Sequence, residues 1–233
     1  MAVNGKYVTA VILAAGSGSR MMTDIPKQNI VLCGKSVLAR ALCAFEKSSL
    51  VDSIVLVVRD ENTESVKRDF GADFVKLSSV ISGGDTRAAS AKAGFCAIPD
   101  KTDIVAFHDA ARCLVTVEDI DKVIRRASET GAATASAGVT DTVKLVDGDI
   151  IKETLDRERL RFAQTPQAFS VDIYRKGLVA LGEDFTRTTD DNMIAEAAGA
   201  KVTAVETSRY NIKITTKDDI LYAEFILSRR GER

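Results

Sequence analysis

The sequence is poor in the residues that build metal centres. Among its 233 residues there is one histidine, His108, and there are four cysteines. The cysteines are scattered and form no C-x-x-C pair, whereas a structural zinc site needs closely spaced soft ligands. We therefore expect reduced thiols packed inside an intracellular protein. The four are Cys33, Cys43, Cys96 and Cys113.

The chain also lacks an excess of charge and a long apolar run. Its formal net charge is −1 at pH 7, so the overall balance attracts neither nucleic acid nor an acidic membrane surface. No apolar stretch reaches the length of a membrane span. The run 8–15 behind Lys6 has the size of a signal-peptide core, but it fits a buried first strand equally well and leads into a glycine loop. We expect a cytoplasmic protein with no nucleic-acid or membrane partner.

What the sequence does contain is an alternation of apolar strand-like runs and helical patterns. The run 53–59 (SIVLVVR), for example, has no polar interruption, which is typical of a strand covered on both faces. The alternation predicts an α/β fold with a Rossmann-like, mostly parallel sheet covered by helices on both faces. The expected strands are 8–15, 53–59, 74–77, 103–108, 202–206 and 211–214, and the expected helices are 36–46, 62–70, 85–98, 117–130, 171–181, 191–198 and 217–228.

One segment breaks this alternation. The stretches 142–146 and 150–155 flank the turn signal D-G-D, which predicts a β-hairpin. A lone hairpin has little of its own to pack against, so we expect it to contact a second subunit. The chain is therefore interpreted as a single domain over residues 1–233, with a projecting arm at residues 139–165.

The loop after the first strand contains small residues and then two cations, Arg20 and Lys27. Glycine lets backbone N–H groups approach phosphate oxygens, and fixed cations add charge. A dinucleotide fingerprint is disfavoured because Met21 stands where its third glycine belongs, and the "CGKS" of a P-loop lacks its first glycine. The alternative is a solvated loop whose cations bind nothing. The small residues are Ala14, Ala15, Gly16, Ser17 and Gly18.

Two later loops strengthen the case for a ligand site. In "SGGDTRAAS" a glycine turn opens a helix, with Asp85 as the expected N-cap and Arg87 as a further cation. In "HDAAR" the strand ends at an acid and a base, and such strand-end groups commonly contact ligands in parallel sheets. We expect Asp109 and Arg112 to be functional, and His108 to be a packed ring.

The ordered set of motifs is distinctive over nearly the whole chain, from residue 10 to about 225. It runs L-A-A-G-x-G-x-R with P-K-Q, G-G-D-x-R-x-x-S, H-D-A-A-R, D-T-V-K, D-R, T-P-Q-x-F, T-D-D and N-I-K-I-T. In this the chain resembles the 2-C-methyl-D-erythritol 4-phosphate cytidylyltransferases. The resemblance implies transfer of CMP from CTP to the polyol phosphate, with release of pyrophosphate, Mg²⁺ as cofactor and a homodimer joined through the arm.

The resemblance also implies roles for residues. Arg20 and Lys27 would stabilise the transition state on the triphosphate, and Arg157 and Lys213 would orient the polyol phosphate. A larger set of residues around these four would bind the two substrates. On the nucleotide side these are Ala14, Ala15, Gly16, Ser17, Gly18, Gly84, Asp85 and Ser90; between the substrates Asp109, Ala110 and Arg112; and on the polyol side Thr142 and Thr165.

Some positions depart from the family pattern, namely Cys113, Thr140 and Asn192. They leave ribitol 5-phosphate open as an alternative second substrate. A nicotinamide-dependent oxidoreductase and a non-catalytic nucleotide-binding module are alternatives from other classes. The chemistry of the main interpretation needs no general base, because a phosphate monoester with a second pKa of about 6 is already largely dianionic at neutral pH. It needs fixed positive charge instead.

Overall fold

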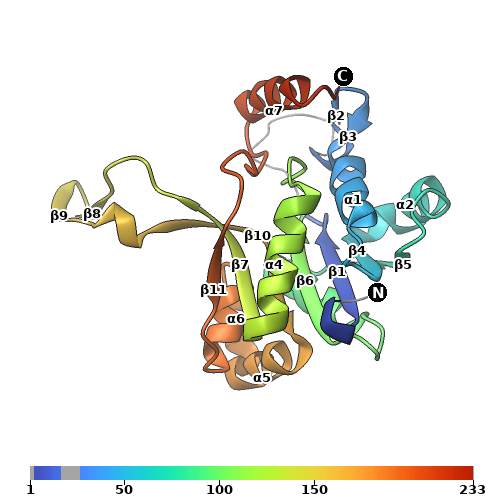
Figure 1. Cartoon of the computed structure of the whole chain (residues 1–233), viewed down its shortest axis with the longest axis horizontal. Coiled ribbons are helices and arrows are strands. Elements are labelled where there is room, and N and C mark those ends of the chain that lie inside the picture. The colour runs from blue at the N-terminus through green and yellow to red at the C-terminus, as the bar shows by residue number, and fades with distance from the viewer. Residues whose placement is uncertain (1–2, 17–26, 233) are drawn as a thin grey trace.

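A seven-stranded sheet forms the centre of the computed structural model, which describes residues 3–16 and 27–232 (Figure 1). The strand order is β11-β7-β10-β6-β1-β4-β5. Strands β6, β1, β4 and β5 run parallel to one another, and β7 runs parallel to β11. The strands are β1 (Val8–Leu13), β4 (Ser53–Val58), β5 (Leu77–Ser82), β6 (Ile104–Asp109), β7 (Ala132–Gly138), β10 (Arg161–Ser170) and β11 (Thr203–Glu206).

Strand β10 is the antiparallel member, because it pairs antiparallel with both β6 and β7. The expectation of a mostly parallel sheet is thus confirmed, but neither β7 nor β10 was expected. Strand β7 reads AATASAG and β10 reads RFAQTPQAFS. Neither is a continuous apolar run, because small and polar residues interrupt both and a proline also interrupts β10, and so the pattern that marks a buried strand is missing.

Helices cover both faces of the sheet, as expected. Alternate residues of each buried strand point to opposite faces, so Ala10 and Ile12 belong to one apolar cluster and Val11 to another. Helices α1 (Val37–Lys47), α2 (Thr63–Phe70) and α4 (Val117–Thr130) pack on the first face. Helices α3 (Arg87–Cys96), α5 (Val171–Leu181) and α6 (Asn192–Ala197) pack on the second.

Helix α7 (Lys217–Arg229) packs separately, against a third cluster that contains Leu32, Leu114 and Ile214. Short elements complete the described chain. They are η1 (Val3–Gly5), η3 (Lys27–Asn29), β2 (Val31–Leu32), β3 (Lys35–Ser36), η4 (Asp60–Asn62), η5 (Arg157–Arg159) and η6 (Gly182–Arg187). Within the described ranges, no helix is both long enough and apolar enough to cross a lipid bilayer.

Several expected boundaries are wrong. The strand expected at 74–77 begins at Leu77 and ends at Ser82, and the segment 211–214 is not a strand. Its apolar residue Ile214 is buried against α7 instead of joining the sheet. The third helix begins at Arg87, so its N-cap is Thr86 and not Asp85: the Thr86 hydroxyl accepts a hydrogen bond from the Ala89 N–H at 3.0 Å.

The predicted hairpin is present and projects far from the sheet (Figure 1). Strands β8 (Lys144–Asp147) and β9 (Ile150–Thr154) form a separate antiparallel pair, and Gly148 at the turn has φ 55°. Its apolar side chains Leu145, Val146, Ile150 and Ile151 are all at least half exposed. An apolar hairpin left open in this way lacks the packing that stabilises isolated hairpins.

Candidate functional site

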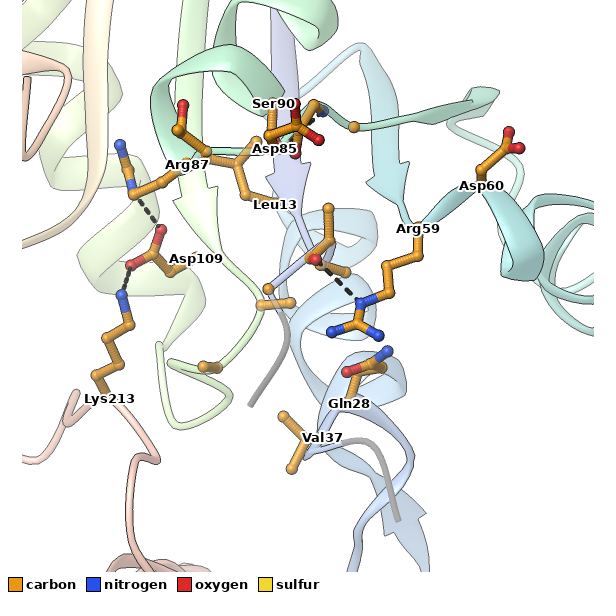
Figure 2. Close-up of a pocket in the computed structure, with 18 of the residues that line it drawn as sticks. Leu13, Gln28, Val37, Arg59, Asp60, Asp85, Arg87, Ser90, Asp109 and Lys213 are labelled. Carbon is orange, nitrogen blue, oxygen red and sulfur yellow. Dashed lines mark hydrogen bonds and ion pairs between the residues drawn. The ribbon is translucent and has the colours of Figure 1, made fainter. Parts of the chain in front are cut away.

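A pocket of about 630 Å³ lies at the carboxyl ends of the central strands. Its walls are the loops that follow β1, β4, β5 and β6, together with the segment that leads into α7. This is the edge at which open parallel sheets bind ligands. Figure 2 shows Arg87, Asp109 and Lys213 on one side of the pocket and Arg59 with Gln28 on the other.

Many of the predicted site residues meet in this pocket. The structure places Ala14, Ala15, Gly16, Gly84, Asp85, Ser90, Asp109, Ala110 and Lys213 in its lining. Ser17, Gly18 and Arg20 lie outside the described residues, as does the side chain of Lys27. The pocket therefore brings together residues that are 200 positions apart in the chain, which the motif order alone does not guarantee.

The glycine turn at Gly83 and Gly84 has no room for side chains. A Cβ on Gly83 would lie 2.6 Å from the Ala15 Cβ and 2.7 Å from the Ser90 hydroxyl oxygen. A Cβ on Gly84 would lie 2.6 Å from that of Ala89. The buried Ser90 hydroxyl bonds to both the N–H and the carbonyl of Gly84, at 3.2 Å each. The turn is consequently packed closely against Ala15, Ser90 and Ala89, and its backbone forms part of the pocket lining.

Asp109 is the centre of a chain of ion pairs. Its Oδ1 accepts a hydrogen bond from Arg87 Nε at 2.9 Å, and its Oδ2 accepts one from Lys213 Nζ at 2.7 Å (Figure 2). Burial alone would raise the pKa of Asp109, but these two positive charges outweigh burial and hold the pKa well below its usual value. The Asp109 side chain is thus a fixed carboxylate flanked by two cations.

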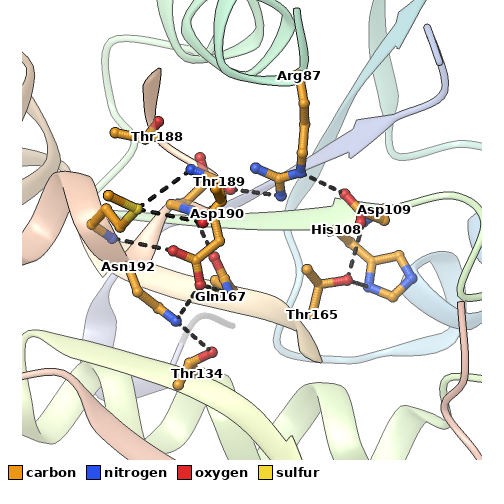
Figure 3. Close-up of polar contacts among 12 residues, drawn as sticks. Arg87, His108, Asp109, Thr134, Thr165, Gln167, Thr188, Thr189, Asp190 and Asn192 are labelled. Atoms are coloured by element: carbon orange, nitrogen blue, oxygen red, sulfur yellow. Dashed lines mark hydrogen bonds and ion pairs between the residues drawn. The ribbon is translucent and has the colours of Figure 1, made fainter. Parts of the chain in front are cut away.

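Thr165 and His108 lie next to Asp109 (Figure 3). The Thr165 hydroxyl oxygen accepts the Asp109 N–H at 3.1 Å and lies 3.0 Å from His108 Nδ1. His108 is fully buried, tilted against the Phe45 ring, with Nε2 3.3 Å from the Arg112 carbonyl. Burial lowers the pKa of His108 to about 3. The expectation of a packed ring is confirmed.

Arg112 does not reach the pocket lining in the described chain. Its Nη1 donates to the Asn211 carbonyl at 2.8 Å and its Nη2 to the Ala163 carbonyl at 3.3 Å. Burial lowers its pKa. In this structure Arg112 ties the segment before Lys213 to β10, so its contact with substrate stays a prediction.

Comparison with known proteins points to the same family as the sequence motifs, over almost the full length of this chain. The sequence pattern of the 2-C-methyl-D-erythritol 4-phosphate cytidylyltransferases matches residues 8–229. The chain belongs to this family. A cytidylyltransferase of this name from Desulforamulus reducens is 39% identical over 228 residues, which are 96% of this chain and 97% of the relative. One from Lachnospira eligens is 40% identical over 224 residues, 94% and 98% of the two chains.

A solved structure of the 4-diphosphocytidyl-2C-methyl-D-erythritol synthase from Anaerococcus prevotii has the same fold. It superimposes with a TM-score of 0.86 at 30% identity and covers 97% of this chain and 98% of its own. The cytidylyltransferase from Francisella tularensis superimposes with a TM-score of 0.79, also at 30% identity, covering 94% and 99%.

Two residues that were predicted to contact the second substrate, Thr142 and Arg157, are not in the pocket lining of their own chain. Thr142 and Arg157 are exposed on the arm, and Arg157 Nη1 donates to the Thr140 carbonyl at 2.8 Å. Thr165 was expected in the arm region, but it is buried in β10, within the sheet. The segment that leaves the sheet spans 139–160, because Gly138 and Arg161 are still paired as neighbours in β7 and β10.

Sequence reasoning about the cytidylyltransferase site missed several residues that line the pocket. Arg59 follows β4, and its Nε lies 3.4 Å from the Ala15 carbonyl. Gln28, Asp60, Glu61 and Thr215 line it too. Arg59 shares a signal with Asp109, since both are charged residues at the end of an uninterrupted apolar strand.

A metal ion in this pocket would need ligands from the nucleotide as well as from the protein. In residues 3–16 and 27–232, no group of three or more histidine, cysteine, aspartate or glutamate side chains is arranged to hold a metal ion. Mg²⁺, however, is commonly bound by one or two carboxylates together with substrate phosphates. Asp109 is a largely buried carboxylate in the pocket wall whose pKa is held well below its usual value, and it suits that mode.

Proposed function

We propose that the protein transfers CMP from CTP to 2-C-methyl-D-erythritol 4-phosphate, giving 4-diphosphocytidyl-2-C-methyl-D-erythritol and pyrophosphate. The observation that carries this proposal is the pocket, whose lining combines a closely packed glycine turn with the ion-paired Asp109 and Lys213 at the strand ends. Relatives across nearly the full length carry the name of this activity.

The end of the pocket at the glycine turn is suited to the nucleoside. Backbone groups of residues 14–16 and 83–85 can form hydrogen bonds with the edge of a base, and the absence of side chains lets the turn lie close to Ala15 and Ser90. A pyrimidine needs less room than a purine. We assign cytosine and ribose to this end, with Ser90 fixing the turn and Asp85 lining it.

The reaction itself is a displacement at phosphorus. A phosphate oxygen of the polyol phosphate attacks the α-phosphorus of CTP, the bond from that phosphorus to the bridging oxygen breaks, and pyrophosphate leaves with the electron pair. The nucleophile is already largely dianionic at neutral pH, which agrees with a buried, neutral His108. Arg20 and Lys27 are assigned to the triphosphate, and Lys213 to the second phosphate.

Mg²⁺ is proposed as the cofactor, with Asp109 as the protein carboxylate that would help to hold it. When bound, Mg²⁺ would neutralise phosphate charge that builds up during the displacement. Asp109 does not need a proton at any stage, because its two cationic neighbours keep it ionised.

The arm is proposed to complete the site of a second copy of this chain. Its exposed apolar residues and the exposed Thr142 and Arg157 support this assignment. The enzyme would then be a homodimer in which each pocket receives an arm from its partner. We also propose that it acts in the cytoplasm, where CTP is available.

The proposal is tested by measuring pyrophosphate release with CTP and a panel of polyol phosphates. We expect release with 2-C-methyl-D-erythritol 4-phosphate and little with ribitol 5-phosphate. Ribitol 5-phosphate as the better substrate would replace the second substrate and leave the cytidylyltransferase assignment intact. Binding of CTP without pyrophosphate release from any polyol phosphate would indicate a non-catalytic module.

A further inference from the structure

A buried carboxylate, Asp191, lies behind the pocket wall. Its side chain is 1% exposed, and it immediately precedes α6. Its Oδ2 accepts a hydrogen bond from Arg87 Nη2 at 2.8 Å, and its Oδ1 accepts one from the Tyr174 hydroxyl at 2.9 Å. Its N–H donates to Gln167 Oε1 at 2.9 Å. Both carboxylate oxygens therefore have donors, and the group is held from three directions.

Arg87 links this buried carboxylate to the pocket. Its guanidinium bonds to Asp109 through Nε, as Figure 3 shows, and to Asp191 through Nη2. One rigid planar group therefore spans two carboxylates. Asp109 in turn pairs with Lys213 through its other oxygen. The order is Tyr174, Asp191, Arg87, Asp109, Lys213, with alternating charge from Asp191 onward. Only the last three line the pocket.

Tyr174, at one end of this series of contacts, is held in place by its neighbours. Tyr174 is fully buried, and its ring centroid lies 4.5 Å from that of Phe107 and 4.8 Å from that of Phe95. The ring is thus fixed by the apolar core between α3, α5 and β6. The Tyr174 hydroxyl occupies Asp191 Oδ1, and Asp191 Oδ2 is left to hold Arg87.

We propose that Asp191 is a positioning residue: by holding Arg87 Nη2, it limits the Arg87 contact with Asp109 to the one bond from Nε and so keeps the second Asp109 oxygen for Lys213. Arginine prefers to meet a carboxylate with two parallel N–H groups. Without the charge of Asp191, the Arg87 fork would turn fully onto Asp109 and compete with Lys213. The Lys213 ammonium would then lose its fixed place in the pocket wall.

This inference rests on the proposed function for its kinetic consequence. Lys213 is assigned to the polyol phosphate, and the nucleoside end is built from other residues. Loss of Asp191 should therefore affect the second substrate more than CTP. Supporting residues behind a site typically change activity by about 10-fold to 100-fold when replaced.

The test compares Asp191→Asn with Tyr174→Phe. The first keeps the size and an acceptor oxygen but removes the charge; the second removes one hydrogen bond and leaves the charge and the Arg87 contact in place. We expect Asp191→Asn to lower kcat/KM for the polyol phosphate by about 10-fold to 100-fold, with the dissociation constant of CTP within about twofold of wild type. Tyr174→Phe should lower the melting temperature with a much smaller effect on kcat/KM.

A double-mutant cycle separates positioning from a structural role. In an Arg87→Lys background the fork is absent, so the kinetic effect of Asp191→Asn should largely disappear. Independent, multiplicative effects of the two substitutions would overturn the proposal. The proposal would also be overturned if Asp191→Asn and Tyr174→Phe had equal kinetic effects that scaled with the decrease in melting temperature of each variant.

Measurements of equilibrium binding test this inference independently of the proposed function. If the wild type binds 2-C-methyl-D-erythritol 4-phosphate in calorimetry but releases no pyrophosphate, the proposed function fails. Weaker binding of that phosphate to Asp191→Asn, by about 10-fold and with CTP binding unchanged, would still support the positioning role. Unchanged binding would refute it.

Discussion

His108 shows at the scale of a single residue how burial sets the behaviour of a titratable group. Its pKa in the folded protein is about 3 because burial disfavours the charged ring, whereas an unfolded histidine has a pKa of about 6.5. Between these two values the unfolded chain binds a proton that the folded chain does not. The stabilising effect of the neutral ring is thus complete above pH 6.5 and is lost as the pH falls toward 3.

We therefore expect the free energy of unfolding to fall as the pH is lowered from 6.5 to 4, with a slope of up to about 1.4 kcal/mol per pH unit from this one group. Asp191 opposes this trend at the acidic end, because burial raises its pKa. Urea unfolding of wild type and His108→Gln across this range measures the difference. Equal slopes for the two proteins would show that His108 does not titrate in this way.

The glycine turn gives a prediction about steric fit. In Gly83→Ala the new methyl group would lie 2.6 Å from the Ala15 Cβ, so Ala15 or the turn must move. Overpacking of this kind costs about 1–3 kcal/mol of stability. The displaced residues also line the nucleoside end, so KM for CTP should rise while KM for the polyol phosphate changes little. Gly138→Ala is a matched control, because no atom lies within 4 Å of its Cβ position. Identical kinetics in both variants would contradict the assignment of this end to CTP.

We expect substitutions of the cationic residues to have different kinetic effects, according to the substrate to which each residue is assigned. An interaction made chiefly in the transition state lowers kcat, whereas one made equally in the ground state changes KM. We expect Lys27→Ala to lower kcat by about 10² or more, and Arg157→Lys to raise mainly the KM for the polyol phosphate because it loses the planar fork. Steady-state kinetics with each substrate varied in turn checks both. A normal kcat for Lys27→Ala, or a defect of Arg157→Lys confined to CTP, would show that the assignment is wrong.

At the scale of secondary-structure elements, a buried arginine joins α1 to the end of β2 and to the segment after α7. Arg40 donates to the carbonyls of Leu32 and Cys33 and to Glu232 Oε2, the last at 2.6 Å. Its side chain is 5% exposed, whereas that of Glu232 is 50% exposed. The carbonyl contacts therefore matter more than the ion pair, which solvent weakens.

We expect Arg40→Met to lower the free energy of unfolding by about 2–5 kcal/mol, because two buried carbonyl groups lose their donors. Glu232→Gln should change it by less than about 1 kcal/mol. Chemical denaturation of both variants measures the two effects. A larger loss for Glu232→Gln than for Arg40→Met would reverse this account of the contact.

Comparing elements shows why sequence reasoning succeeded in part. Strands β1, β4 and β6 are buried on both faces and appear in the sequence as apolar runs, so they were predictable. Strand β10 contains Gln164 and Gln167, which are buried but satisfied by hydrogen bonds to distant residues. Their partners come from tertiary structure, which a local pattern does not contain. The same reason hides Asp191, whose function depends on Arg87 more than 100 residues away.

For the whole molecule, the decisive question is whether the arm acts in trans. If it does, a protein with Arg157→Ala and a protein with Lys213→Ala can complement one another. Statistical mixing of the subunits would restore one intact site in half of the dimers, or about a quarter of the wild-type activity. Light scattering should show a dimer. A monomer with full activity at high dilution would exclude the shared site.

The pairing of Gly138 with Arg161 has a consequence for how this architecture can be altered. Because Gly138 and Arg161 are the last paired residues of β7 and β10 before the arm, the segment between them is an insertion whose two ends already lie side by side. Closing a longer loop costs little extra free energy, so a hairpin of another length or from another relative can be grafted at 139–160 without changing the register of β7 or β10. One residue added within 161–170, by contrast, would turn alternate side chains of β10 to the opposite face. The arm is therefore an exchangeable module, and the strand that carries it is not.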